Sequence, residues 1–320
     1  MTPTKNRRAP SALIALTIPL ALAMSAPVTA QSDPERTLAP QEEVLEDGTV
    51  VTRILPGQRP NAIRPKGEPE RNENGDVAAG PLIDPKVPSV LAILSHPDDE
   101  LIIAPVLARI AREQGEVTLV FATSGDAGPG ISDLEKGTEL AELRESEARC
   151  SAFALGLEEP IFWRFGDGTL ANEARNSQGL MRDLSGRIAG LIALQEPTVI
   201  MTWGPDGGYG HSDHRITSNA VTQILQDMGP GRPDLLYAAF PALEGDDAEL
   251  PGFDGWGRTH PSLVTDKIAY EVPDLDAAIA SVNCYESQFS AEARRALAGT
   301  LHAQVWKGNV PFRLAFVRQR

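Results

Sequence analysis

Short apolar runs alternate with segments of helical periodicity between residues 88 and 240, and this alternation constrains the fold more than any other feature. The runs are "SVLAILS" (89–95), "VTLVFATS" (117–124), "PIFWRF" (160–165), "TVIMTWG" (198–204) and "DLLYAAF" (234–240). Continuous apolar runs of this kind fit strands that are buried on both faces. Because strands separated by helices form right-handed βαβ units, we predict an α/β fold with a doubly wound, mainly parallel sheet and helices on both faces.

The segments between these runs carry apolar residues three and four positions apart, which is the spacing of one helix face. We expect a helix that ends at Gly115, helices over residues 139–155 and 179–195, and a helix from about Asp213 to residue 228. After residue 240 the pattern weakens. It resumes with strand-like "KIAYEV" (267–272), helices near 274–283 and 290–303, and a final strand "FRLAFV" (312–317), which we expect to complete the same domain.

The first thirty residues have the composition of a secretory signal peptide. Lys5, Arg7 and Arg8 precede the apolar core "SALIALTIPLALAM", which is short for a membrane span, and "VTA" offers a cleavage site after Ala30. No cysteine lies near this site to carry a lipid. We therefore predict export through a cleaved N-terminal signal peptide, a periplasmic or secreted location, and no stable membrane anchor.

Residues 31–86 are rich in proline and charged residues and contain no aromatic residue. Such a composition buries too little apolar surface to offset the entropy lost on ordering. We predict a signal peptide at 1–30, a Pro-rich, acidic, flexible tail at 31–86 and one domain at 87–320. Within the tail, "TVVTRIL" (49–55) could instead add an edge strand to the sheet.

The charge balance is strongly acidic. Loss of residues 1–30, which contribute three positive charges and no negative ones, changes the net charge from −15 to −18. This sign disfavours nucleic acid and anionic lipid as partners. Cys150 and Cys284 are the two cysteines; in an oxidising compartment they could pair, or they could remain two separate buried thiols. The oligomeric state is not encoded in any of these features.

Two polar motifs follow predicted strands: "HPDDE" (96–100) and "GGYGHSDH" (207–214). Ligands of an open parallel sheet bind beyond the carboxyl ends of its strands, so both motifs should reach the same edge. Either motif alone could be a helix start, where acidic residues are favourable. Imidazoles beside carboxylates in both loops are, however, typical of a site for a divalent ion such as zinc.

Taken together, the two motifs resemble the PIG-L / LmbE-like zinc-dependent N-acetylglucosaminyl deacetylases. The resemblance runs from about Ser89 to residue 230 and includes "TSGDAG", "LRESEA" and "GDG". It implies a Rossmann-like, LmbE-like deacetylase domain over 87–320 and a metal-dependent amidohydrolase that acts on C–N bonds. It also implies one Zn²⁺ ion, with another divalent metal such as Fe²⁺ as the alternative, and a small-molecule or glycan substrate that carries an N-acetyl amino sugar.

Carried over by position, the resemblance makes His96, Asp99 and His214 the metal ligands. Asp98 would be the general base for a zinc-bound water, whose pKa the ion lowers towards ~7. His211 would donate a proton or hydrogen bond as the amine leaves.

Six further residues have less specific predictions. Tyr209 would help to stabilise the oxyanion, and Asp213 would orient a histidine ligand. Arg144 lies on the inward stripe of its helix and would bind substrate, as the resemblance implies, or pair with Glu147. Asp126 and Asp167 could accept hydrogen bonds from sugar hydroxyls, although turn chemistry explains both nearly as well. We expect Glu100 to favour the helix N-terminus rather than bind metal.

The leading function is an exported zinc-dependent hydrolase that removes the acetyl group from an N-acetylated amino sugar (GlcNAc-type) conjugate. One alternative is a metal-dependent hydrolase of another ester or phosphoester, a class that often uses two ions. The other is a non-catalytic carbohydrate-binding protein, which the presence of Asp98 together with both histidines disfavours. The aglycone is not specified; Phe253 and Trp256 could stack on a sugar or simply pack.

Overall fold

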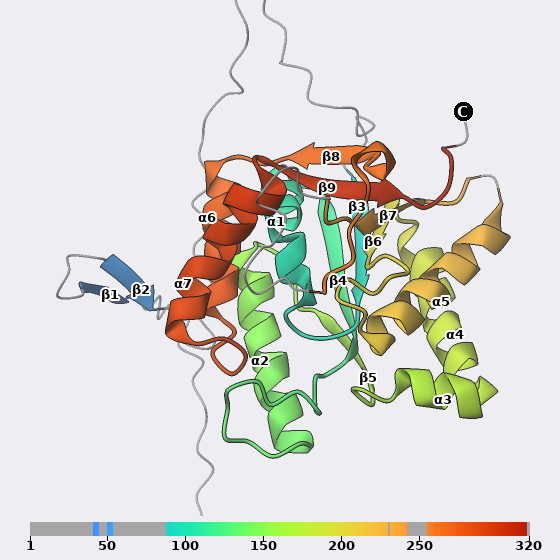
Figure 1. The fold of residues 1–320 in the computed structure, drawn as a ribbon, viewed down its shortest axis with the longest axis horizontal. Coiled ribbons are helices and arrows are strands. Elements are labelled where there is room, and N and C mark those ends of the chain that lie inside the picture. Colours follow the sequence, from blue (N-terminus) through green and yellow to red (C-terminus); the bar gives the residue numbers. More distant parts are fainter. Residues whose placement is uncertain (1–40, 45–49, 54–87, 230, 242–254, 319–320) are drawn as a thin grey trace, which may run out of the picture.

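A computed structural model describes residues 41–44, 50–53, 88–229, 231–241 and 255–318 (Figure 1). The predicted signal peptide at 1–30 and most of the predicted tail at 31–86 lie outside these ranges. Within the tail, β1 (Gln41–Val44) and β2 (Val50–Arg53) pair antiparallel with each other. The run considered as an edge strand thus pairs within the tail, in a sheet of two strands.

The main sheet has seven strands in the order β5-β4-β3-β6-β7-β9-β8. The first five in this order are parallel to their neighbours, and β9 and β8 are antiparallel. The strands are β3 (Ser89–Leu94), β4 (Glu116–Thr123), β5 (Ile161–Phe165), β6 (Val199–Thr202), β7 (Asp234–Ala238), β8 (Asp266–Ala269) and β9 (Asn309–Leu314). The predicted α/β fold with a mainly parallel sheet is confirmed.

Strand β3 explains why the apolar runs are continuous. Val90, Ala92 and Leu94 pack into the core on one face of the sheet, and Leu91 and Ile93 pack into the core on the other. Since successive side chains of a strand point to opposite faces, a central strand needs apolar residues at every position.

Helices cover both faces, as predicted, and Figure 1 shows them as two layers. One layer holds α1 (Ala104–Arg112), α2 (Thr138–Ala154), α6 (Val272–Asn283) and α7 (Ala291–Thr300), which continues into the π-helix η4 (Leu301–Trp306). The other holds α3 (Leu170–Asn176), α4 (Gln178–Gln195) and α5 (Ser212–Met228). Helix α3 and the short 3-10 helices η1 (Asp99–Ile102) and η3 (Pro261–Leu263) were not predicted.

The centre of the sheet is a topological switch point. Strands β3 and β6 lie side by side, yet the chain passes from β3 to α1 on one face and from β6 to α5 on the other. The loops after these two strands therefore diverge at their carboxyl ends, which is the position where ligands bind in doubly wound folds. Both polar motifs lie in these loops.

The last strand begins earlier than predicted. Strand β9 covers Asn309–Leu314 and includes Pro311, whereas the predicted strand began at Phe312. Proline lacks the N–H that a sheet ladder uses. The Pro311 carbonyl still accepts a hydrogen bond from the N–H of Ala239, at 3.1 Å. A proline is therefore tolerated in this strand, and the strand extends towards α7.

Cys150 and Cys284 form a disulfide, with their Cα atoms 5.7 Å apart. The sequence left open whether the two cysteines pair, and the structure shows that they do. The bond joins the last turns of α2 to the C-terminal end of α6, across 134 residues of chain. In the described part of the chain, no helix combines the length and apolar character that a membrane crossing requires.

Candidate metal centre

The loops after β3 and β6 bring three buried side chains to one point. His214 Nε2 lies 3.1 Å from His96 Nδ1 and 3.1 Å from Asp99 Oδ1, and His96 Nδ1 lies 3.8 Å from the second oxygen of Asp99. Tetrahedral zinc with bonds of about 2.0–2.2 Å places its ligand atoms roughly 3.3–3.6 Å apart. The two distances from His214 Nε2, to His96 Nδ1 and to Asp99 Oδ1, lie close to this spacing.

Asp99 is oriented by the backbone of its own loop. Its Oδ2 accepts hydrogen bonds from the N–H groups of Ser95 and His96, both at 2.9 Å. This leaves Oδ1 directed at His214. The motif "SHPDDE" therefore folds so that its backbone holds one carboxylate oxygen and presents the other.

His214 has a fixed orientation as well. Its Nδ1 lies 3.1 Å from the carbonyl oxygen of Gly207, which can only accept, so Nδ1–H donates to this oxygen and Nε2 faces His96 and Asp99. Trp203 stacks on the imidazole at a centroid distance of 4.7 Å and an interplanar angle of 6°. Both Gly207 and Gly208 have positive φ, and a Cβ on Gly208 would lie 2.7 Å from the Trp203 ring. The two glycines allow the backbone to approach His214 this closely.

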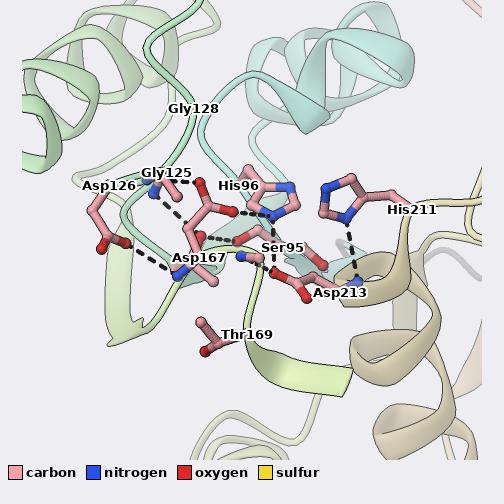
Figure 2. A network of polar contacts seen from close by, with 12 residues as sticks. Ser95, His96, Gly125, Asp126, Gly128, Asp167, Thr169, His211 and Asp213 are labelled. Carbon is pink, nitrogen blue, oxygen red and sulfur yellow. Dashed lines mark hydrogen bonds and ion pairs between the residues drawn. The ribbon is translucent and has the colours of Figure 1, made fainter. Parts of the chain in front are cut away.

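His96 is oriented by two carboxylates, shown in Figure 2. Its Nε2 lies 3.0 Å from Asp167 Oδ1 and 3.4 Å from Asp213 Oδ2, so an Nε2–H donor leaves Nδ1 facing His214. Burial lowers the pKa of His96, but Asp167, Asp213 and the charge of Asp99 outweigh this effect and raise it to about 10. A cation that binds Nδ1 must therefore compete with a proton.

Among the described residues, two groups have donor atoms that all lie within 4.8 Å of one another: His96 with Asp167 and Asp213, and His96 with His211 and His214. In the first group both carboxylates already accept backbone hydrogen bonds, Asp167 from Ala127 at 3.1 Å and Asp213 from Gly168 at 2.7 Å. Both carboxylates also face His96 Nε2, so we assign them to its N–H rather than to the ion, as carboxylates behind a metal-bound histidine commonly act.

Asp126 and Asp167 link the loops after β4 and β5. Asp126 Oδ1 accepts the N–H of Asp167 at 3.1 Å, and Asp167 Oδ2 accepts the N–H of Ala127 at 3.1 Å (Figure 2). The predicted contact of either side chain with sugar hydroxyls stays a prediction. The contact of Asp167 with His96 was missed, because nothing in "FGDG" indicates which loop it faces.

His211 caps the N-terminus of α5. Its Nδ1 accepts the N–H of Asp213 at 3.2 Å, so in the neutral ring the proton is on Nε2. The ring is half-buried, with centroids 4.6 Å from His96 and 4.8 Å from His214. Burial, together with these two histidines, lowers the pKa of His211. The side chain is thus a neutral hydrogen-bond donor beside the centre.

Asp98 has an unusual backbone conformation, with φ 99° and ψ −17°. Its Oδ2 accepts a hydrogen bond from Arg144 Nη2 at 3.0 Å, and the side chain is 22% exposed. Burial raises the pKa of Asp98 to about 6, although the charge of Arg144 opposes this shift. The carboxylate lies beside the predicted ligands and remains accessible.

Arg144 is buried and contacts the loops around it. Its Nη2 donates to the Pro97 carbonyl at 2.6 Å and its Nη1 to the Gly125 carbonyl at 3.2 Å. A Cβ on Gly125 would lie 2.4 Å from Nη1, which explains the glycine in "TSGDAG". Its ion pair is with Asp98, whereas Glu147, the partner considered from sequence, accepts hydrogen bonds from Ser287. The predicted contact with substrate stays a prediction.

Tyr209 lies at the rim of the centre and is 46% exposed. Its ring centroid is 5.3 Å from that of His214 and 5.2 Å from that of Trp256. Burial and the nearby carboxylates raise its pKa, so the phenol keeps its proton and can donate a hydrogen bond. Trp256 also packs on Phe240 at 4.5 Å; Phe253 lies outside the described residues.

The expectation for Glu100 was incomplete. The residue does lie in the first turn of η1, but its carboxylate is fully buried among hydroxyl groups. Its Oε1 accepts hydrogen bonds from Tyr285 Oη, at 2.5 Å, and from Ser151 Oγ. Burial raises the pKa of Glu100 to about 7, against the effect of both hydroxyls. These partners lie 51 and 185 positions away, so no local pattern could have indicated them.

Comparison with known proteins finds one matching family model, related sequences and solved structures of the same fold. Residues 91–225 match the model of the PIG-L family, GlcNAc-PI de-N-acetylase. A 1D-myo-inositol 2-acetamido-2-deoxy-alpha-D-glucopyranoside deacetylase of Mycobacterium sp. (strain KMS) is 31% identical over 162 residues, 46% of this chain and 53% of that protein. The protein of the same name from Thermobifida fusca (strain YX) is 33% identical over 167 residues, 45% of this chain and 58% of its own. The match therefore spans little more than half the length of these relatives.

Two solved structures share the fold. The N,N'-diacetylchitobiose deacetylase from Pyrococcus horikoshii has a TM-score of 0.52 at 18% identity, over 72% of this chain and 87% of its own. An A40926 pseudoaglycone deacetylase has a TM-score of 0.51 at 20% identity, over 72% of this chain and 99% of its own. At these identities the likeness establishes the fold, which is the LmbE-like one predicted. Residues 91–225, which match the PIG-L family model, carry both polar motifs.

Proposed function

We propose that this protein is an exported, zinc-dependent amidohydrolase that removes the acetyl group from an N-acetylated amino sugar conjugate. One observation supports this above the others. His96 Nδ1, His214 Nε2 and Asp99 Oδ1 converge, while every other polar atom of these side chains contacts the backbone or a carboxylate. Such tethered donors are typical of metal sites.

The donor set fits zinc. Two imidazole nitrogens and one carboxylate oxygen are ligands that zinc accepts, and three protein ligands leave one coordination position open for catalysis. When bound, the ion would act as a Lewis acid on the acyl oxygen and would increase the acidity of a water molecule at the open position. Iron(II) accepts the same donors, so the metal's identity has to be measured.

Asp98 is positioned to act as the general base. Its carboxylate is adjacent in sequence to the ligand Asp99, is partly exposed, and has a pKa of about 6, near the value that suits a base at neutral pH. Arg144 holds one oxygen, which leaves the other to take the proton from the attacking water. Proton transfer of this kind contributes about 10²- to 10⁴-fold to a rate.

His211 and Tyr209 are assigned to the developing oxyanion. His211 Nδ1 accepts a backbone hydrogen bond, which directs its Nε2–H away from the helix and disfavours a doubly protonated ring. We therefore favour a hydrogen-bond donor role for His211 over proton transfer to the leaving amine. Tyr209 offers a second donor from the exposed rim. Donors directed at the position of the oxyanion commonly contribute most of such a rate enhancement.

The substrate class rests on the relatives. The names of the curated relatives describe deacetylation of an inositol-linked 2-acetamido-2-deoxyglucose, and that of a structural neighbour describes deacetylation of diacetylchitobiose. We extend this to N-acetylglucosamine-type conjugates without naming the aglycone. Aromatic rings at the rim, Tyr209 and Trp256, would suit the apolar face of a sugar.

Export rests on two further observations. The N-terminal thirty residues have the composition of a signal peptide. The Cys150–Cys284 disulfide is of a kind that persists in oxidising compartments and is rare in the cytosol. Fractionation of the native host, with a probe against the domain, would test this; protein found only in the cytosol with residues 1–30 attached would disprove it.

Acetate release tests the function directly. Purified protein should release acetate from at least one member of a panel of N-acetylated sugars, chelation should abolish release, and zinc should restore it. Release that continues after complete removal of metal would disprove the mechanism. Two ions per chain with activity on phosphoesters would favour the esterase alternative, and sugar binding without turnover would favour the binding protein.

A further inference from the structure

We propose that Glu100, Ser151 and Tyr285 form a buried clamp that holds Asp98 in its working position. We call these three residues the Glu100 clamp. The inference rests on the proposed function, because it concerns the residue assigned as the general base. It makes Glu100 a positioning residue and gives a role to Tyr285, which lies outside the segment that matches the PIG-L family.

Asp98 needs external support. Its φ of 99° lies in the left-handed region, where a residue with a Cβ is rarely found, and Asp98 is not a glycine. Backbone conformations of this kind persist at functional sites only when the surrounding contacts maintain them. If the Asp98 backbone relaxed, its carboxylate would rotate away from its present direction.

Glu100 holds the backbone of Asp98 by a hydrogen bond. Its Oε2 accepts the N–H of Asp98 at 3.1 Å, and a fixed N–H direction restricts φ of that residue. Its Oε1 is held by the hydroxyls of Tyr285, at 2.5 Å, and Ser151. Since both hydroxyls donate to the same oxygen, the carboxylate cannot turn, and Oε2 stays directed at the Asp98 N–H.

Arg144 supplies the opposing support. It donates to the Pro97 carbonyl at 2.6 Å and to Asp98 Oδ2 at 3.0 Å. The Pro97–Asp98 peptide is thus held at its oxygen by Arg144 and at its nitrogen by Glu100. The residue is held between a buried cation on one side and a buried carboxylate on the other.

The disulfide links the two parts of the chain that carry Ser151 and Tyr285. Cys150 precedes Ser151 and Cys284 precedes Tyr285, so the bond joins the two chain segments that carry the hydroxyl donors. Ser151 Oγ also contacts Ser281 Oγ at 2.8 Å, which adds a second link between α2 and α6. Residues far from the metal centre in sequence therefore determine where Asp98 points.

Kinetics with a matched control test the consequence. Tyr285→Phe removes one hydroxyl from the clamp, and Tyr237→Phe removes a comparable buried hydroxyl that contacts Thr222, at 2.6 Å, away from the site. We expect Tyr285→Phe to lower kcat about tenfold and Glu100→Gln about tenfold to a hundredfold, with KM and metal content unchanged. Tyr237→Phe should retain wild-type kcat. Equal kcat for Tyr285→Phe and wild type, or a loss of metal in the clamp variants, would overturn the inference.

A double-mutant cycle tests whether the clamp acts through Asp98. In the Asp98→Asn background, Tyr285→Phe should have no further effect on kcat, because the group that it positions is already inactive. An equal fold-loss in both backgrounds would mean that Tyr285 acts independently, which would overturn the proposal.

Crystal structures provide a readout that does not depend on the substrate. In Glu100→Gln, the Asp98 carboxylate should leave hydrogen-bond distance of Arg144 Nη2, while His96 and His214 stay in place. An unmoved Asp98 would overturn the clamp even if the enzyme is a deacetylase. Conversely, a wild-type protein that releases no acetate from any substrate would disprove the proposed function, and the position of Asp98 in the variant would still decide on the clamp.

Discussion

The matched segment, residues 91–225, and the C-terminal part, residues 255–318, contribute to the site in different ways. Every predicted metal ligand lies in the first, and short-range contacts hold the ligands there, such as Asp99 Oδ2 on the N–H groups of Ser95 and His96. The second provides no predicted ligand. It supplies supports instead, through Tyr285 on Glu100 and through Gln288 on the Gly128 carbonyl.

This difference separates chemistry from positioning. A loop can carry its own metal ligands when its backbone tethers them, so the motifs are readable from a few residues. The direction of Asp98 instead depends on groups from helices that are distant in the sequence. Substitutions in the first part should therefore abolish metal binding or turnover, whereas those in the second should reduce turnover or stability by degrees.

The largest effect is expected from the ligands. His214→Ala should lose the metal and reduce acetate release to background, because the remaining two donors cannot retain an ion at a catalytic site. Atomic emission measures the metal content, and acetate release from an N-acetylated sugar substrate measures the activity. A variant that keeps full metal content would contradict the assignment of His214.

Asp98→Asn comes next. The amide keeps the shape of the side chain but cannot accept a proton, so kcat should fall about 10²- to 10⁴-fold. Metal content should stay at the wild-type level, which separates this variant from His214→Ala. If kcat is unchanged, another group is the base.

Asp167→Asn tests the carboxylate behind His96. Removal of such a partner of a histidine ligand typically costs about 10- to 100-fold in metal affinity or activity. Competition with a chromogenic chelator measures the affinity. Asp133 is an exposed aspartate that precedes α2 in the sequence. Asp133→Asn is the matched control and should retain wild-type metal affinity. Equal metal affinities in the two variants would contradict this role of Asp167 and would favour the predicted contact with substrate.

The disulfide should affect stability more than catalysis. Replacement of both Cys150 and Cys284 by serine opens a loop of 134 residues and should cost about 2–5 kcal/mol of unfolding free energy. Urea unfolding of the oxidised, folded protein and of the variant measures the difference. The residual effect on kcat should be smaller than that of Glu100→Gln; a larger one would mean that the disulfide itself, and not the hydroxyls, holds the site.

Much of the fold could be predicted because its strands are buried on both faces. Runs such as "SVLAILS" have few other stable placements, and the alternation with helices then determines the parallel topology. Helix α3 was missed because it is short and follows two glycines, Gly166 and Gly168. The start of β9 was misplaced because Pro311 is tolerated in a position where proline is usually excluded.

The site was only partly predictable, for a physical reason. His96 and His214 follow adjacent strands at the switch point, so strand order alone brings them together. The contacts of Asp167 with His96 and of Glu100 with Tyr285 depend on packing between loops and helices. Two cysteines likewise give no pairing until α2 and α6 are known to be neighbours.

Anomalous diffraction at the zinc absorption edge, from crystals of the zinc-loaded protein, tests the central claim most directly. The account predicts one peak, within about 2.0–2.2 Å of His96 Nδ1, His214 Nε2 and a carboxylate oxygen of Asp99. A peak bound instead by His96 Nε2 with Asp167 and Asp213, or two peaks at the carboxyl ends of β3 and β6, would contradict it.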